Sequence, residues 1–364
     1  MGRKTVQGLI LAMGLGWCAV PAFSMDIHGT GTPSVADLLK ICLKAYAPLS
    51  VNVPIQYQAR ESRQGIDQWL DRDADFLMVN FPLIPTDEKQ TGGNVLYIPV
   101  GLNAAVVTYN LPGVPSGLRL TPRARFDIFS GKITRWDNSN LREMNPGLPL
   151  PDMAIQVLYR DDESSLFDLF PNYLKTIDDS WPMADAGEDR NVHWPVGRGV
   201  HGNQELLRQM DNSAGSIGVI DYLAAASQTL PMARLKNEAG FFTAPSSQSL
   251  IDAVAELLVL PDDLRVYVTH PRDPDAYPLT SFEWVLVRPR VHRGSHDFRK
   301  NQALAGFLGW WLSDGQTVEQ EADAVSLPER FLAQAQAQVR AIQVNSNPTP
   351  TIPVSNPIAA PATR

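Results

Sequence analysis

The chain has 364 residues, of which 44% are hydrophobic and 19% charged, and its 31 basic and 39 acidic side chains give a net charge of -8. This length and composition predict a soluble globular protein of about two domains. The acidic balance excludes an ordinary nucleic-acid binder, which carries a basic surplus, and two cysteines exclude a disulfide framework or a cysteine-rich zinc module. If such a chain binds an anion, local geometry has to hold it.

The first residues are typical of a secretory signal peptide. Arg3 and Lys4 form a basic region, residues 6–20 form an apolar stretch, and residues 22–24 form a small-residue cleavage site. The apolar stretch is shorter than the roughly 20 residues that span a bilayer. We therefore predict that residues 1–24 are a cleaved signal peptide and that the mature protein is periplasmic or secreted. A signal anchor is the alternative interpretation.

Helical and extended patterns alternate along the middle of the chain. Apolar residues at helical spacing predict helices over 35–46 and 250–258, and a capping-box pattern at 326–329 predicts a helix that begins at Ser326 and runs towards Ile342. Short β-branched or aromatic runs predict strands over 54–58, 76–81, 104–110, 155–160, 216–222 and 282–287. This alternation predicts an α/β fold with helices on both faces of a sheet.

The last twenty residues, 345–364, differ from the rest of the chain. They contain five prolines and carry no charge before Arg364. Such a segment buries too little apolar surface to offset the entropy lost on ordering. We predict a disordered, proline-rich tail, with a role in peptide recognition as the alternative.

Hydroxyl side chains stand where three of the predicted helices begin. Thr32 precedes the helical pattern that starts at Val35. Ser62 follows the predicted strand at 54–58 and precedes a predicted helix that contains residues 66–70, and Ser164 follows the predicted strand at 155–160 and precedes a predicted helix over 166–173. Unpaired backbone N–H groups and the helix dipole favour anions at such ends, so three converging ends would form an oxyanion site. Ordinary helix capping also accounts for each hydroxyl taken alone.

Arg160 ends an apolar strand, a position at which a guanidinium needs a partner. Asp162 follows two residues later and is able to orient the guanidinium, which leaves the other donors for an anion. A purely structural ion pair between the two side chains is an equally consistent interpretation.

Nearly the whole chain resembles the exported phosphate-binding proteins that deliver their ligand to ABC importers, together with the related DING proteins. The resemblance rests on Gly-Thr-Gly-Thr-Pro at 29–33, Tyr-Gln to Gly at 57–65, Asp-Phe to Pro-Leu at 75–83, Phe-Ser-Gly-Lys-Ile-Thr-Arg-Trp-Asp at 129–137, Asn-Pro-Gly-Leu-Pro-Leu-Pro at 145–151, Trp-Pro-Val-Gly-Arg-Gly at 194–199, Gly-Ser-Ile-Gly at 215–218 and Tyr-Pro-Leu-Thr-Ser at 277–281. The segments at 129–137 and 145–151 are specific in combination, and the order of all segments matches.

The resemblance implies a two-lobed periplasmic binding protein of type II-like architecture, with a hinge and a central cleft. Lobe I would consist of residues 25–100 and 281–344, and lobe II of residues 101–280. The implied protein is not an enzyme and has no metal or cofactor. It would be a monomer that binds phosphate or a related oxyanion between the lobes, for import by an ABC permease of the inner membrane or for phosphate sensing.

The resemblance also assigns residues to the site. By position, Thr32, Ser62, Arg160 and Ser164 match phosphate-binding residues of the family, and Asp162 matches the carboxylate that orients the arginine. In the family, phosphate is held by hydroxyls, backbone amides and one arginine, without a metal.

Three positions depart from the family pattern, namely Asn80, Ser165 and Leu166. Asn80 stands where the family has an aspartate that accepts the proton of bound phosphate, and an amide can either accept or donate. Leu166 replaces a hydroxyl donor, and losing a hydrogen bond to a charged group costs on the order of 1.5–3 kcal/mol. We therefore expect weaker or less selective binding, with micromolar or poorer phosphate affinity and measurable competition by sulfate.

Two other functions remain open from the sequence. The chain could be a ligand-less signalling or secretion accessory protein that keeps the two lobes, or a phosphatase with Ser164 as its nucleophile beside Arg160. A dinucleotide-type glycine pattern at 197–202, followed by Asp221, is set aside because Pro195 interrupts the strand that should precede it. The pair His292 and His296 lies in a basic segment and is interpreted as solvated.

Overall fold

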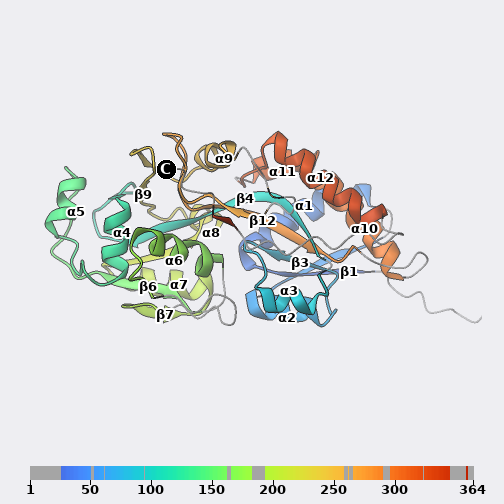
Figure 1. The fold of residues 1–364 in the computed structure, drawn as a ribbon, viewed down its shortest axis with the longest axis horizontal. Helices are drawn as coiled ribbons and strands as arrows, with labels where there is room; N and C mark the ends of the chain where they lie inside the picture. The colour runs from blue at the N-terminus through green and yellow to red at the C-terminus, as the bar shows by residue number, and fades with distance from the viewer. Residues whose placement is uncertain are drawn as a thin grey trace, which may run out of the picture.

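A computed structural model of the chain describes residues 26–50, 53–60, 62–93, 95–161, 165–182, 193–257, 261, 265–289, 296–322, 324–344 and 358–359. The predicted signal peptide lies outside these residues. The described elements form two groups at the two ends of the long axis, with β4 and β12 passing between them (Figure 1). The α/β fold predicted from the sequence is confirmed.

Lobe I, as the name is used below, is the group around the first three strands. It contains β1 (Ile27–Gly31), η1 (Pro33–Val35), α1 (Ala36–Tyr46), η2 (Ala47–Leu49), β2 (Ile55–Ala59), α2 (Ser62–Leu70), β3 (Phe76–Val79), α3 (Pro85–Gln90), α10 (His296–Trp311), α11 (Gly315–Glu321) and α12 (Glu329–Val344).

Lobe II is the group that follows in the chain, and β4 (Leu96–Asn110) and β12 (Thr280–Val287) connect it to lobe I. It contains β5 (Arg119–Leu120), α4 (Pro122–Phe129), α5 (Ser139–Met144), β6 (Gln156–Arg160), α6 (Ser165–Ile177), β7 (Arg198–Val200), α7 (Gly202–Asp211), β8 (Ser216–Asp221), α8 (Tyr222–Ser227), β9 (Arg234–Lys236), β10 (Phe242–Thr243), α9 (Ser247–Ala255) and β11 (Val266–Tyr267). The predicted lobe boundaries, at residues 100/101 and 280/281, remain a prediction.

One eight-stranded sheet runs through both lobes, in the order β2-β1-β3-β12-β4-β8-β6-β7. β4 makes this continuity possible because it is 15 residues long. Its first part, up to Ala104, pairs with β12, and its last part, from Ala105 to Asn110, pairs with β8. The same strand therefore belongs to both lobes, and the chain crosses between them without a break in the sheet.

The core consists of strands that are buried on both faces. β3 and β12 are buried at every residue, as expected when helices cover both sides of a sheet. α1 and α2 pack on β2 and β1, and α12 packs on β4. The apolar pattern predicted over 35–46 forms η1 and α1, which bury Val35, Leu39 and Cys42.

β1 is a strand that the sequence patterns did not predict, because its residues are glycine-rich. The two glycines are required by close packing against β3. A Cβ atom added to Gly29 would lie 2.0 Å from the ring of Phe76, and one added to Gly31 would lie 2.0 Å from the carbonyl oxygen of Met78. Gly31 also has a φ of 133°, which side-chain-bearing residues rarely adopt.

The last long helix begins later than predicted. α12 starts at Glu329 rather than at Ser326, so the capping-box prediction was wrong there. The hydroxyl of Ser326 instead donates to the carbonyl of Gln316 at 3.1 Å, and the first helical N–H groups of Phe331 and Leu332 donate to the carbonyl of Pro328. A tertiary contact has taken the side chain that the local pattern assigned to the cap.

Within the predicted tail, the structure describes only Ile358 and Ala359. They form β13, which pairs in parallel with β11. Disorder of the rest of residues 345–364 remains a prediction. No helix in the described ranges has the length and apolar character needed to cross a membrane.

Candidate functional site

The carboxyl ends of strands from the two lobes face each other beside β4. β3 ends at Val79, which pairs through Trp284 of β12 with Pro99 of β4. β8 runs in the opposite direction and ends at Asp221, which pairs with Ala105 of β4. Ligands of α/β proteins usually bind outside the carboxyl ends of the strands. Here two sets of such ends converge within a short stretch of one strand.

Asp221 is the centre of a buried hydrogen-bond cluster at this place. Its Oδ1 atom accepts from Nδ2 of Asn80 at 2.8 Å and from Nδ2 of Asn103 at 3.4 Å. Its Oδ2 atom accepts from Nδ2 of Asn203 at 2.9 Å. We call these four residues the Asp221 cluster. Because Asn80 follows β3 in lobe I and Asp221 ends β8 in lobe II, the cluster joins the two lobes directly.

Arg160 reaches this cluster from the end of β6. β6 is parallel to β8, so Arg160 and Asp221 lie at the same edge of the sheet. Nη1 of Arg160 donates to Oδ1 of Asn203 at 2.7 Å, and Asn203 in turn donates to Asp221. Arg160 is 6% exposed. Asp221 thus holds the amide of Asn203, and this amide in turn orients the buried guanidinium of Arg160.

Glu283 of β12 brings a second acid to the cluster. Nδ2 of Asn103 donates to Oε1 of Glu283 at 2.5 Å, whereas Oε2 has no hydrogen-bond partner among the described residues. Burial, and after it the negative charge of Asp221, raises the pKa of Glu283 well above its usual range. Burial disfavours the charged form of a carboxyl group. Burial therefore favours the neutral form of Glu283, whereas three amides donate to the carboxyl group of Asp221.

Thr32 follows β1, which is parallel to β3, so it lies at the carboxyl ends of the lobe I strands, as Asn80 does. Its backbone N–H donates to the carbonyl of Met78 at 3.1 Å, and its carbonyl accepts from the hydroxyl of Tyr57 at 2.8 Å. Its Oγ1 atom is 3.0 Å from the hydroxyl oxygen of Ser34 and makes no capping bond to η1. η1 packs against α8, which begins directly after Asp221. Helix capping therefore does not explain Thr32.

The other predicted site residues are not tested by side-chain contacts. Ser62 is the first residue of α2, as the loop pattern predicts, but its side chain lies outside the described part. Asp162 and Ser164 also lie outside the described residues, and α6 begins at Ser165. The anion contacts of Ser62 and Ser164 and the orienting role of Asp162 remain predictions.

The sequence patterns missed most of the cluster, although a signal was present. Asn103 and Glu283 interrupt strands that are otherwise apolar, and a polar group buried in a strand needs a partner. The sequence patterns involve Asp221 only through a glycine motif and do not indicate Asn203. The pairing could not be derived, because Asn103 meets residues 118 and 180 positions away.

The described residues contain no group of three or more His, Cys, Asp or Glu side chains that could hold a metal ion. In the Asp221 cluster, amide groups rather than open coordination positions separate the acids. Of the histidine pair set aside above, His292 lies outside the described residues. The chemistry that the site offers is therefore hydrogen bonding from a guanidinium, amides and a hydroxyl.

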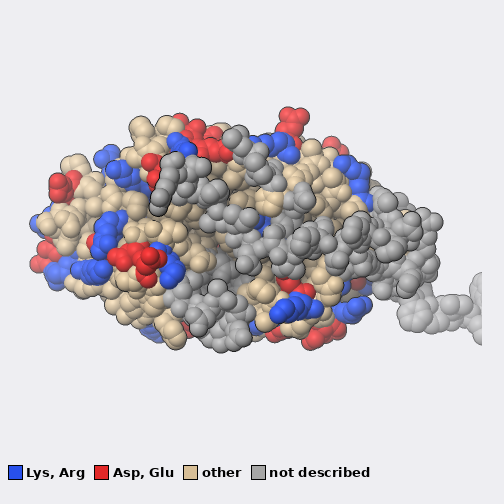
Figure 2. Space-filling view, viewed as in Figure 1, with Lys and Arg blue, Asp and Glu red and all other residues tan. Residues whose placement is uncertain are grey.

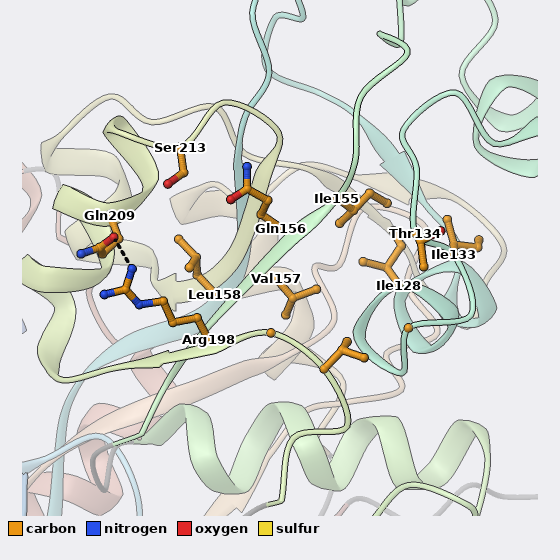
Figure 3. A pocket seen from close by; sticks show the side chains of 13 residues that line it. Ile128, Ile133, Thr134, Ile155, Gln156, Val157, Leu158, Arg198, Gln209 and Ser213 are labelled. Atoms are coloured by element: carbon orange, nitrogen blue, oxygen red, sulfur yellow. Dashed lines mark hydrogen bonds between the residues drawn. The ribbon is translucent and has the colours of Figure 1, made fainter.

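A cavity of about 260 Å³ lies in lobe II, towards the opposite end of β6 from Arg160 (Figure 3). Its wall is largely aliphatic and includes Ile128, Ile133, Ile155, Val157, Leu158 and Val196. On its rim, Nη1 of Arg198 donates to Oε1 of Gln209 at 3.2 Å. None of the residues predicted to bind an anion lines this cavity.

The exposed charges are of mixed sign. On the face drawn in Figure 2, Lys and Arg side chains are interspersed with Asp and Glu over both lobes. Exposed ion pairs include those of Arg123 with Asp127 and Asp178. The described surface in this view offers an anion no extended positive field, so attraction has to come from local groups such as Arg160.

Comparisons with known proteins agree on one family. A model of the PBP superfamily domain matches residues 19–315. The phosphate-binding protein PstS of Methanocaldococcus jannaschii is 30% identical over 323 residues, which are 83% of this chain and 82% of the relative. The phosphate-binding protein PstS of Pasteurella multocida is 28% identical over 339 residues, which are 92% of this chain and 95% of the relative.

Solved structures show the same fold. A human phosphate binding apolipoprotein superposes with a TM-score of 0.67 at 15% identity, covering 86% of this chain and 94% of that one. A phosphate binding protein from Stenotrophomonas maltophilia superposes with a TM-score of 0.61 at 17% identity, covering 86% and 93%. At these identities the likeness is one of fold.

Proposed function

The chain belongs to the PBP superfamily and, within it, to the family of the phosphate-binding protein PstS, and from this membership we propose that it binds phosphate or a related oxyanion between its two lobes. We further propose that it is exported to the periplasm and works as a monomer that delivers the anion to an ABC permease or takes part in phosphate sensing.

The observation that carries the proposal is the meeting of strand ends at the Asp221 cluster. Arg160 is the buried cation at this place, and Asn203 holds its guanidinium in one orientation. A guanidinium presents several N–H donors in a fixed plane, which suits an oxyanion. The hydroxyl of Thr32, which caps no helix, lies at the carboxyl end of β1, on the facing side in lobe I. Together these groups supply a cation and a hydroxyl from opposite lobes.

The remaining contacts in this proposal come from helix starts. Ser62 begins α2 after β2, and α6 begins directly after the segment that contains Ser164. Hydroxyls and backbone N–H groups at these two N-termini would add donors for the anion. Asp162 is proposed to share with Asn203 the orienting of Arg160. No metal or cofactor is part of this scheme.

The test is a thermal-shift and calorimetry panel on the mature chain with phosphate, sulfate, arsenate, a phosphonate and pyrophosphate. We expect phosphate to raise the melting temperature, as a ligand that binds the native state does, with micromolar or weaker affinity. Failure of every oxyanion to raise it would contradict the proposal and favour a ligand-less accessory protein. Turnover of a phosphomonoester that Ser164→Ala abolishes would favour a phosphatase.

A further inference from the structure

Asn80 has two different atoms at the end of its side chain, and the structure shows how they are used. Its Nδ2 atom donates to Oδ1 of Asp221 at 2.8 Å. No hydrogen bond among the described residues uses its Oδ1 atom. A carboxylate accepts hydrogen bonds and does not donate them. Asp221 therefore fixes the orientation of the Asn80 amide, with the nitrogen toward the carboxylate and the oxygen turned away from it.

The fixed orientation changes what residue 80 can offer a ligand. A freely rotating amide either accepts or donates, which is why the sequence alone predicts poor discrimination between oxyanions. Nδ2 keeps a second N–H, but because the first is donated to Asp221 the amide cannot turn, so Oδ1 of Asn80, which only accepts, is held at the end away from Asp221. The side chain is 3% exposed, so water cannot readily substitute for a missing donor.

Hydrogen phosphate and sulfate differ in the feature that such an acceptor detects. The two are tetrahedral dianions at slightly alkaline pH, but hydrogen phosphate carries a proton that it can donate and sulfate carries none. An oxygen of sulfate facing Oδ1 of Asn80 would place two acceptors together without a proton, which leaves a buried polar group unsatisfied. The charge of the anion does not distinguish them, whereas the proton does.

Resting on the proposed function, we propose that Asp221 is a positioning residue for anion selectivity. By holding Nδ2 of Asn80, it makes Oδ1 of Asn80 an obligatory acceptor, so that the interlobe site prefers an oxyanion that carries a proton, such as hydrogen phosphate or hydrogen arsenate, to a fully ionised one. Asn80 and Asp221 together then perform the selection that the resemblance assigns to a single aspartate. This replaces the expectation that sulfate competes measurably.

The other acid of the cluster provides a matched control. Glu283 is as buried as Asp221 and receives a hydrogen bond from the same Asn103, but among the described residues no hydrogen bond joins it to Asn80. Because burial favours its neutral form, Glu283→Gln changes little of its charge or shape. A merely structural role for the buried acids would make Asp221→Asn and Glu283→Gln lower the affinities for both anions together.

The experiment measures phosphate and sulfate affinities by calorimetry at pH 8 for the mature chain, Asp221→Asn and Glu283→Gln, with melting temperatures as a check of folding. We expect the wild-type protein to bind phosphate at least about tenfold more tightly than sulfate. Asp221→Asn should reduce this ratio of affinities by about tenfold, which is the loss expected for one hydrogen bond. Glu283→Gln should leave the ratio within about twofold of wild type. An unchanged ratio in Asp221→Asn would overturn the inference.

Asn80→Ala keeps the test decisive if Asp221→Asn does not fold. It removes Oδ1 directly and should reduce the phosphate-to-sulfate ratio as much as Asp221→Asn does, with no further loss in the double variant. A ratio unaffected by Asn80→Ala would also overturn the inference. If the wild-type protein binds neither anion, the proposed function fails and this inference with it. If it binds both and no variant alters the ratio, only this inference fails.

Discussion

The two ends of β6 differ in almost every respect. At the carboxyl end, Arg160 joins a cluster of buried polar side chains drawn from both lobes, with short hydrogen bonds. Towards the amino end, the strand borders a cavity of about 260 Å³ with largely aliphatic walls inside lobe II (Figure 3). The cavity is therefore not where the buried guanidinium of Arg160 and its amide partner are.

Because of this contrast, we place the proposed anion site by strand direction rather than by cavity size. The carboxyl ends of parallel strands, and the helices that follow them, lie at one edge of the sheet. β1, β3, β6 and β8 all do so, and the continuous strand β4 brings the edges of the two lobes together. The cavity lies away from that edge, between β6, β7, α4 and α7.

The largest effect that separates the two ends is expected from Arg160→Gln. Removing the buried guanidinium should lower phosphate affinity by about 100-fold, because hydrogen bonds to a charged group are among the strongest in a binding site. Titration calorimetry of the purified variant measures this directly. Affinity equal to that of the wild-type protein would place the anion somewhere other than the end of β6.

The stability of the protein should also depend on pH, because of a buried acid in lobe I. Glu319 of α11 lies beside β4 near Gly101 and is buried, and burial raises its pKa to about 8. Between the ordinary pKa and pH 8 the folded chain keeps a proton that the unfolded chain releases, so the free energy of unfolding falls as the pH rises. The contribution of Glu319 to the free energy of unfolding is fully present below about pH 4.5 and is lost as the pH rises through 8.

Urea denaturation at pH 5.5 and pH 8 measures this slope. Between these two pH values, the fall in the free energy of unfolding should be smaller in Glu319→Gln than in the wild-type protein, by on the order of 3 kcal/mol. Glu283 contributes a fall of the same sign. Glu321→Gln, at an exposed position of the same helix, is the matched control and should leave the slope intact. Equal slopes in wild type and Glu319→Gln would show that burial of this acid does not set its protonation.

A smaller effect on anion binding is expected from Asn203→Ala. Asn203 connects Arg160 to Asp221, so its loss should free the guanidinium to adopt other orientations and reduce phosphate affinity by about tenfold. The control is Asn212→Ala, at the opposite end of α7, where the exposed amide donates to the carbonyl of Arg208. If both variants bind equally well, the amide of Asn203 has no part in orienting the arginine.

The smallest effect is expected at the cavity. Arg198 on β7 pairs with Leu158 of β6, is exposed and lies on the rim of the cavity. Arg198→Gln should leave phosphate affinity within about twofold and stability within about 0.5 kcal/mol, as exposed substitutions usually do. A large loss of affinity in this variant would reverse the comparison and point to the cavity as the anion site.

Most of the strands were predictable because burial on both faces leaves long apolar runs in the sequence. The runs at 76–81, 216–222 and 282–287 correspond to β3, β8 and β12. The glycine-rich β1 was not predictable in this way, because its glycines are required by the close approach of β3 rather than by any local preference. The start of α12 was misplaced because Ser326 bonds to a distant carbonyl.

The sequence by itself determined the α/β class and the resemblance to the phosphate-binding family, and it indicated Thr32 and Arg160 as candidate site residues. These conclusions depend on periodicity and on residues close in the chain. Only the tertiary structure decided that Asp221 stands among Asn80, Asn103 and Asn203, and that Glu283 adjoins them. The physical reason is that a buried polar group must find partners wherever the packed sheet brings them. Here the sheet pairs Asn80 with a residue 141 positions away, a distance that no local pattern encodes.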